Sequence, residues 1–117
     1  MNWKILFIAF FFGLGVAPLA AQTPTFTLDH NIFHTSTLSS VTMTFSSPYT
    51  GNAQLIVYNS AGEVVKNLYN GSLSPNVLQT LTWDGKNLSG ENVASGVYII
   101  WLKLDLGVIV KKLIVVR

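Results

Sequence analysis

Apolar residues recur at every second position along most of this chain, and that period argues against a helical fold. Residues 41–45 read Val-Thr-Met-Thr-Phe, and residues 77–83 alternate in the same way. Successive side chains of a β-strand point to opposite faces of its sheet, so the pattern buries one face and leaves the other in water. The same reasoning predicts strands over residues 53–58, 63–69, 97–104 and 108–116, and at most one more over residues 24–28.

Clusters of turn-forming residues separate the predicted strands. Asn59 and Gly62 bracket one tight reversal, because both residues accept the positive φ angles of hairpin turns. The longest connection, residues 84–96, contains three glycines, the last of which is Gly96. In that loop Asp84 is expected to accept hydrogen bonds from backbone amides, and Gly85 to supply an unusual φ angle. Six to seven short antiparallel strands with regularly spaced turns predict an all-β sandwich.

Alternation within each strand also predicts the side chains of the core. The more polar strand, residues 63–69, is expected at an edge of its sheet. The residues expected to be buried are Val41, Met43, Phe45, Leu55, Val57, Leu81, Trp83, Tyr98, Ile100 and Leu102. Because the chain has no cysteine, this core must stabilise the fold without a disulfide, and no lipid-modified cysteine is available as an anchor.

The start of the chain reads as a secretory signal peptide. Lys4 supplies a positive charge, residues 5–16 are an unbroken apolar run, and small residues precede a cut after Ala21. The alternative is an uncleaved membrane anchor, since residues 5–21 reach the lower limit of the roughly 17–25 residues that span a bilayer. Cleavage is favoured, so contact with a membrane is expected only during export. The expected parts are a signal peptide (1–21), an N-terminal segment with at most one strand (22–38) and a sandwich domain (39–117).

The charges exclude nucleic acid as a partner class. Without Lys4, six basic residues face five acidic ones, whereas nucleic-acid binding needs a basic stripe. So few charges of either sign give weak protection against association. This composition favours a protein partner or self-assembly.

Three sequence blocks resemble the immunoglobulin-like (Ig-like) domain at the C-terminus of the flagellar hook-capping protein, the FlgD-type Ig-like family. Residues 55–65 (LIVYNSAGEVV) resemble its strand–turn–strand, residues 83–87 (WDGKN) with Gly90 its Trp-Asp-Gly loop, and residues 93–98 (VASGVY) the start of its penultimate strand. Lys111-Lys112-Leu113 resembles its basic last strand. The order and spacing of the blocks make the resemblance specific. It implies an Ig-like sandwich of the kind attached to larger exported proteins as an accessory module.

This chain is expected to act without a second domain, which departs from the family pattern and argues against a hook-capping role. The C-terminal sorting domain of the type IX secretion route is a second, similar family. It shares the Asn-x-x-Gly turn, the Gly-x-Tyr strand start and the terminal lysines, but such domains are normally appended to cargo. The Trp-Asp-Gly block favours the FlgD-type family.

Residues suited to catalysis or zinc binding are sparse. Asp29, His30 and His34 form an Asp-His-x-x-x-His pattern, but a zinc site needs three or four ligands and the chain has no other histidine and no cysteine. The five acids are scattered, and no glycine-rich loop precedes a predicted helix. We therefore expect no enzyme activity and no cofactor.

The loop at residues 84–91 carries side-chain oxygens at Asp84, Asn87 and Glu91. Calcium binds six to eight oxygens, so such a loop could contribute ligands. The spacing does not match a calcium-binding loop and Lys86 lies in its middle. The favoured interpretation is a structural loop, and calcium binding remains the alternative.

The candidate partner-contact surface comprises Ile99, Trp101 and Lys103. These residues share one face of the strand at residues 97–104, and Lys103 should direct that face to water. An exposed Trp beside an Ile is typical of a contact surface. A neighbouring loop or the N-terminal segment could instead cover Trp101. The predicted function is a non-catalytic module in protein contact or assembly at the cell surface, with carbohydrate binding or secretion sorting as alternatives.

Overall fold

A computed structural model of the chain describes residues 23–117. The predicted signal peptide and its cleavage site therefore lie outside the described residues. Within residues 23–117, no helix is long and apolar enough to cross a membrane.

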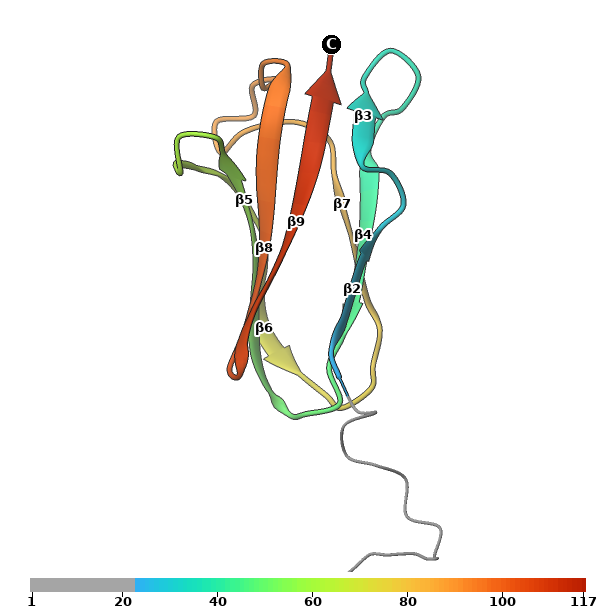
Figure 1. The fold of residues 1–117 in the computed structure, drawn as a ribbon, viewed down its shortest axis with the longest axis vertical. Helices are drawn as coiled ribbons and strands as arrows, with labels where there is room; N and C mark the ends of the chain where they lie inside the picture. Colours follow the sequence, from blue (N-terminus) through green and yellow to red (C-terminus); the bar gives the residue numbers. More distant parts are fainter. Residues whose placement is uncertain (1–22) are drawn as a thin grey trace, which may run out of the picture.

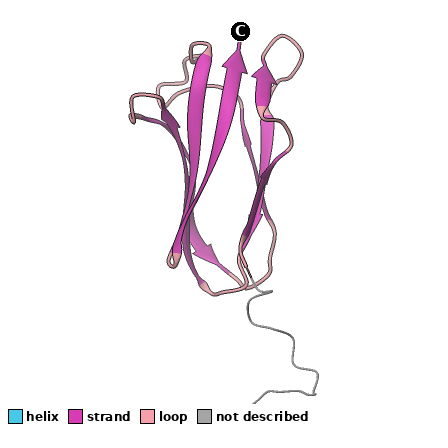
Figure 2. Cartoon of the chain, viewed as in Figure 1, coloured by secondary structure: helices cyan, strands magenta, loops and turns pink. Residues whose placement is uncertain are grey.

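The described residues form two β-sheets that pack face to face (Figures 1 and 2). The smaller sheet has the strand order β2–β4–β7, from Thr25–Leu28, Val41–Ser46 and Gln79–Trp83. The larger has the order β3–β9–β8–β5–β6, from Ile32–His34, Gly107–Val116, Gly96–Leu104, Gly51–Asn59 and Val64–Leu73. All neighbours are antiparallel except β3 and β9, which run parallel. The predicted all-β sandwich is confirmed.

The N-terminal segment contributes two strands, so the prediction of at most one strand before Ser39 is wrong. β2 pairs with β4 in the smaller sheet; the chain then bends at residues 29–31, and β3 pairs with β9 in the larger sheet. Phe26 and Phe33 are buried in the core. Strands of three or four residues are too short to show a clear period of two, and only the pairing with distant strands reveals them.

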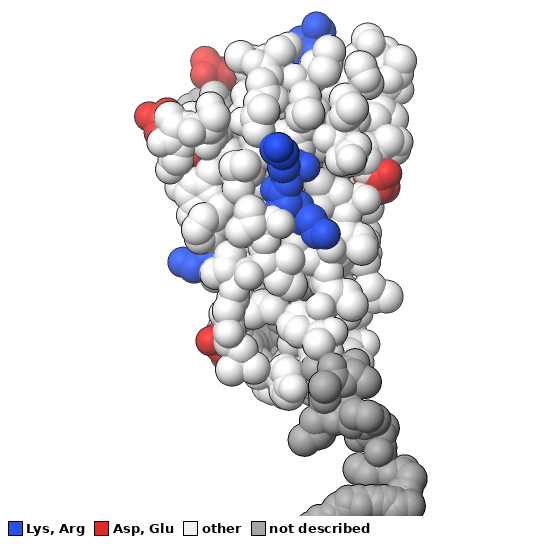
Figure 3. Space-filling view, viewed as in Figure 1, with Lys and Arg blue, Asp and Glu red and all other residues white. Residues whose placement is uncertain are grey.

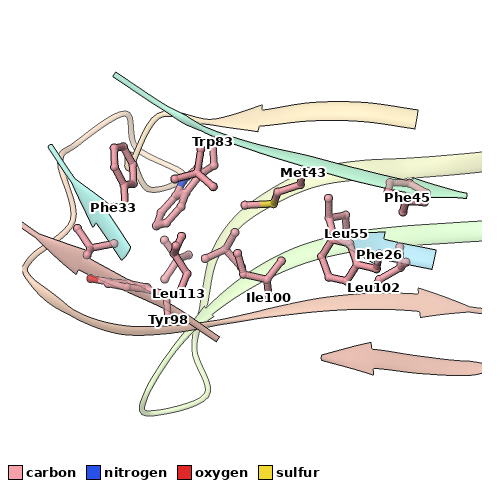
Figure 4. Close-up of a cluster of buried hydrophobic side chains, with 14 of the residues drawn as sticks. Phe26, Phe33, Met43, Phe45, Leu55, Trp83, Tyr98, Ile100, Leu102 and Leu113 are labelled. Carbon is pink, nitrogen blue, oxygen red and sulfur yellow. The ribbon is translucent and has the colours of Figure 1, made fainter. Parts of the chain in front are cut away.

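The core lies between the sheets, where Figure 4 shows side chains from both layers meeting. All the residues predicted to be buried are buried except Leu81, which is half-buried because β7 is an edge strand. Trp83 is 1% exposed, and its ring packs against Tyr98 at 5.6 Å and Phe33 at 6.3 Å between ring centroids. The core residues that the sequence did not predict include Phe26, Phe33, Val65, Leu73, Val93, Leu113 and Val115.

The edge position predicted for residues 63–69 is confirmed, since β6 is the last strand of the larger sheet. β6 continues to Leu73, beyond the predicted end of the strand, because β5 pairs with it as far as Gly51. The pairing shifts register next to Ile56 and again next to Tyr58. These irregularities bend the strand pair and increase its local twist.

Candidate partner-contact surface

The predicted contact residues lie on the outer face of the larger sheet. In β8, the buried residues Ile100 and Leu102 point to the core, so Ile99, Trp101 and Lys103 point away from it. Directly opposite residues of paired strands share a face. Ile56 of β5 and Val110 of β9 flank Trp101, and Tyr58 and Lys112 flank Ile99.

Trp101 and Tyr58 form the centre of this face. Their rings meet edge to face, with centroids 5.6 Å apart and an interplanar angle of 65°. Together with Asn59, Ile99 and Val110 they line a shallow depression of about 470 Å³. Trp101 is half-buried, since Tyr58 covers part of the ring and the rest remains open to solvent.

The N-terminal segment does not cover Trp101. β2 belongs to the other sheet, and β3 pairs with β9 only at Ile114–Val116, whereas Trp101 pairs with Val110. Within residues 23–117, the N-terminal segment is therefore not the cover of this indole that the sequence allowed.

The apolar character extends well beyond the three residues that the sequence singled out. Val64 (43% exposed), Val110 (49%) and Val97 (39%) lie on the same outer face by their pairing. We define the outer-face patch as the residues Ile56, Tyr58, Val64, Val97, Ile99, Trp101, Val108, Val110 and Ile114. Alternation within one strand identifies only the patch residues of that strand. The full patch can be identified only when the order of the strands in the sheet is known.

The two signs of charge are segregated in the described chain. All five acids lie outside the strands, in turns and loops, whereas the larger sheet carries four lysines in its strands: Lys66, Lys103, Lys111 and Lys112. Within residues 23–117 the single close contact between a basic and an acidic side chain joins His30 Nδ1 and Asp29 Oδ1, at 3.2 Å. Figure 3 shows basic atoms over the middle of β9 and acidic atoms near the margins of this view. The net charge of the chain is small, but the strands of the larger sheet carry only positive charges.

Two turns at one end of the sandwich have the same pattern of hydrogen bonds. The Asn59 side-chain oxygen accepts hydrogen bonds from the amides of Ala61 (3.0 Å) and Glu63 (2.9 Å), and its NH₂ group donates to the Glu63 carboxylate (2.9 Å). Gly62 completes the turn with a φ of +84°. The corresponding residues of the second turn are Asn87, Ser89, Gly90 and Glu91. Asn59 and Gly62 therefore lie in a tight turn, and the repeated Asn-x-x-Gly-Glu is visible in the sequence.

The loop at residues 84–96 is held by its own groups and by Arg117. Asp84 accepts a hydrogen bond from the Lys86 amide (3.1 Å), and Gly85 has a φ of +78°. Arg117 donates to the carbonyls of Gly85 (3.0 Å) and Val93. Gly96, the last residue of the predicted loop, is the first residue of β8.

Metal chemistry has little support in the described chain. Within residues 23–117, no three His, Asp or Glu side chains come together. The Asp84 and Asn87 oxygens already accept hydrogen bonds from loop amides. His30 lies beside Asp29, and His34 is exposed on β3.

Among residues 23–117, the pKa values of two side chains depart from their usual values, and both shifts have structural causes. Slight desolvation opposes ionisation of Asp29, but the hydrogen bond from the Thr42 amide (2.9 Å) and the neighbouring His30 hold the pKa of this carboxyl below its usual value. Burial raises the pKa of Tyr98, partly offset by Arg117, and the Tyr98 hydroxyl donates to the Ala94 carbonyl at 2.7 Å. Neither group lies in the outer-face patch.

Two packed sheets, with an N-terminal segment that gives one strand to each of them, define the chain as an Ig-like sandwich module. A family model described as the FlgD Ig-like domain matches residues 26–105. The chain therefore belongs to the FlgD Ig-like family, a family of non-catalytic modules. The resemblance found in the sequence is confirmed.

Solved structures show the same fold in larger proteins. PorZ, a surface component of the type IX secretion system of Porphyromonas gingivalis, is 19% identical with a TM-score of 0.54, over 79% of this chain and 11% of PorZ. Dimeric latent PorU from the same organism is 20% identical with a TM-score of 0.58, over 88% of this chain and 10% of PorU. The Pseudomonas fluorescens alkylpurine DNA glycosylase AlkC is 10% identical with a TM-score of 0.50, over 81% of this chain and 30% of AlkC. The chain spans about a tenth of the two Porphyromonas gingivalis proteins and is at most 20% identical to them, so the likeness concerns the fold alone.

No curated protein matches the chain.

Proposed function

We propose that this chain is an exported, non-catalytic Ig-like module that binds a protein partner at the cell surface or outside the cell. The outer-face patch is the proposed contact surface. Its proposed occupant is a protein surface with apolar side chains at its centre and carboxylates around them. The observation that carries the proposal is a half-open Trp101 within a broad apolar face whose sheet carries lysines and no acid.

Apolar area and charge support the same kind of partner. Large exposed apolar patches are rare on proteins that act alone and are common at contact sites. Lys103 and Lys112 lie on the same face as Trp101, and no described acid pairs with them. Complementary charges around an apolar centre favour correct encounters and disfavour basic surfaces.

Carbohydrate binding is the weaker candidate. A sugar-binding platform presents aromatic faces that lie in one plane, so that a pyranose ring can stack on them. The rings of Tyr58 and Trp101 meet at 65°, and Tyr58 directs its ring against the indole rather than beside it. This arrangement fits a compact apolar anchor better than a flat platform.

Export belongs to the proposal because the leader supports it. The charge, apolar run and small residues at the start of the chain are those of a secretory signal. PorZ, whose domain has a similar fold, is described as a bacterial surface component of a type IX secretion system, and that description agrees with an envelope location. A role in secretion sorting is the alternative. A reporter fused to the leader and domain would then reach the cell surface or the medium, while a reporter fused to the leader alone would leave the cytoplasm but stop in the periplasm.

The test is a site-specific cross-link followed by a binding measurement. A photoreactive amino acid at Val110 should cross-link one acidic protein in the native cells. The same group at Leu78, which is 64% exposed outside the larger sheet, should not. Trp101→Lys should then weaken binding of the purified partner by tenfold or more, with unchanged melting temperature.

The matched control is Leu78→Lys, which makes the same kind of change away from the patch. It should bind as wild type does. Equal binding by Trp101→Lys and wild type would refute the contact surface. Selective binding to oligosaccharides on a glycan array, lost in Trp101→Lys, would replace the proposal with carbohydrate binding.

A further inference from the structure

One edge of the larger sheet is left unpaired along most of β9. On one side β9 pairs with β8 over its whole length. On the other side β3 covers only Ile114–Val116. Within the described chain, no strand pairs with the first seven residues of this edge, Gly107 to Leu113.

The direction of the free backbone groups follows from two hydrogen bonds. The Ile114 amide donates to the Asn31 carbonyl (3.0 Å), and the Val116 carbonyl accepts from Thr35 (3.0 Å). Both residues therefore direct their backbone groups away from β8. Backbone groups alternate along a strand, so Lys112, Val110 and Val108 also present N–H and C=O groups to the open side.

The side chains at this edge carry positive charge on both faces. Lys112 pairs with Ile99 and lies on the outer face, whereas Lys111 pairs with the buried Ile100 and lies on the opposite side. Both lysines are exposed, and no acid of the described chain pairs with them. An edge with free backbone groups and lysines on both faces is suited to an extended segment that carries carboxylates.

We propose that the free edge of β9, from Val108 to Lys112, binds an extended acidic segment of a protein partner as an added β-strand. Backbone hydrogen bonds to the three outward-facing residues supply the register. Carboxylates on the two faces of the added strand meet Lys111 and Lys112. Five residues of strand span about 17 Å, enough for a short linear motif.

A second copy of the chain is the less suitable occupant. Pairing β9 with another β9 would gather four lysines at one edge without an acid, and like charges across strands are destabilising. Lysines at an edge commonly prevent such self-association. The same lysines attract an acidic strand, so they select the partner as well as protecting the edge.

The inference deepens the proposed protein contact by assigning a binding mode to an edge adjacent to the outer-face patch. The two proposals fail separately. Trp101→Lys tests the patch and leaves the β9 backbone unchanged, so it should still bind a strand probe. Val110→Pro tests the edge.

The experiment uses the folded chain and a synthetic peptide, Thr-Glu-Glu-Val-Thr-Glu-Glu-Val, as the acidic probe. In the free chain, the amides of Val110 and Lys112 should exchange quickly with solvent, while those of Ile109 and Lys111 should be protected by β8. The peptide should slow exchange at Val110 and Lys112. Binding should weaken at high salt, because the attraction is between exposed charges.

The Val110 N–H points to the open side of β9, so Val110→Pro removes this donor without removing a hydrogen bond to β8. Proline is tolerated at a sheet edge. The variant should keep the fold and weaken peptide binding tenfold or more, whereas Val110→Ala should bind as wild type does. Lys111→Glu with Lys112→Glu should reverse the preference from the Glu peptide to its Lys counterpart.

Three results would overturn the inference. The first is equal peptide binding by wild type and Val110→Pro. The second is equal binding of the Glu and Lys peptides by wild type. The third is a wild-type dimer in solution that Val110→Pro converts to a monomer, because the occupant would then be a second copy.

Discussion

Trp83 joins three parts of the molecule at one end of the core. Its ring packs edge to face against Phe33 and tilted against Tyr98, and its indole N–H donates to the Lys86 carbonyl at 2.9 Å. The hydrogen bond satisfies the one polar group of a nearly buried side chain. Trp83 therefore fixes the end of β7 to the loop that follows it and to β3 of the opposite sheet.

Trp83→Ala should lower the free energy of unfolding by about 3–5 kcal/mol, because it leaves a large cavity. Domains of this kind are stable by roughly 5–15 kcal/mol, so the variant should be close to unfolding. Urea denaturation measures the loss. Trp83→Phe keeps most of the ring but loses the hydrogen bond, and should cost less than Trp83→Ala. A melting temperature of Trp83→Ala within a few degrees of wild type would contradict the core position.

At the scale of elements, the bend at residues 29–31 is a connection that the sequence did not predict. It carries the chain from one sheet to the other, and Asp29 anchors it to β4. The Asp29 amide donates to the Thr42 carbonyl (3.0 Å), and the Asp29 carboxylate accepts from the Thr42 amide (2.9 Å). The bend lets Phe26 and Phe33 enter the core from different sheets.

Asp29→Asn should lower stability above the usual carboxyl pKa of 3.8 and have little effect in strong acid. The carboxylate has a lowered pKa in the folded chain, so its contribution is present above that usual value and is lost as the pH falls through the folded value. The side chain is 43% exposed, and solvent screening limits the effect to about 1 kcal/mol or less. Unfolding curves of both proteins at neutral and acidic pH measure it. A wild-type advantage that persists in strong acid would show that the charge is not the cause.

At the scale of the whole molecule, the distribution of charge distinguishes the two sheets. The larger sheet carries lysines on β6, β8 and β9, and the acids are confined to connections. Alternation predicted the orientation of Lys103, but not that it shares a face with Lys112. That relation requires β8 and β9 to be neighbours in space.

The exported protein should begin at Gln22. The leader has a positive residue, an apolar run and a small-residue exit. The intact mass of the protein recovered outside the cytoplasm tests this directly. Ala21→Trp places a bulky residue before the cut and should leave the leader attached. Wild-type protein that retains Met1 in the membrane fraction would favour the anchor instead.

The sequence by itself determined what depends on neighbours along the chain. The period of two placed Met43, Trp83 and Ile100 in the core, and the residues around Asn59 and Gly85 encode their turns locally. These features need only alternation of side chains and the conformational preferences of Asn, Asp and Gly.

The tertiary structure decided what depends on strand order. Phe33 is buried because β3 crosses to β9, Tyr58 meets Trp101 because β5 lies beside β8, and the edge at Val110 is free because β3 covers only the last residues of β9. Each of these relations joins residues far apart in the sequence. The alternation of side chains within one strand does not specify these relations, because the same alternation is compatible with any neighbouring strand.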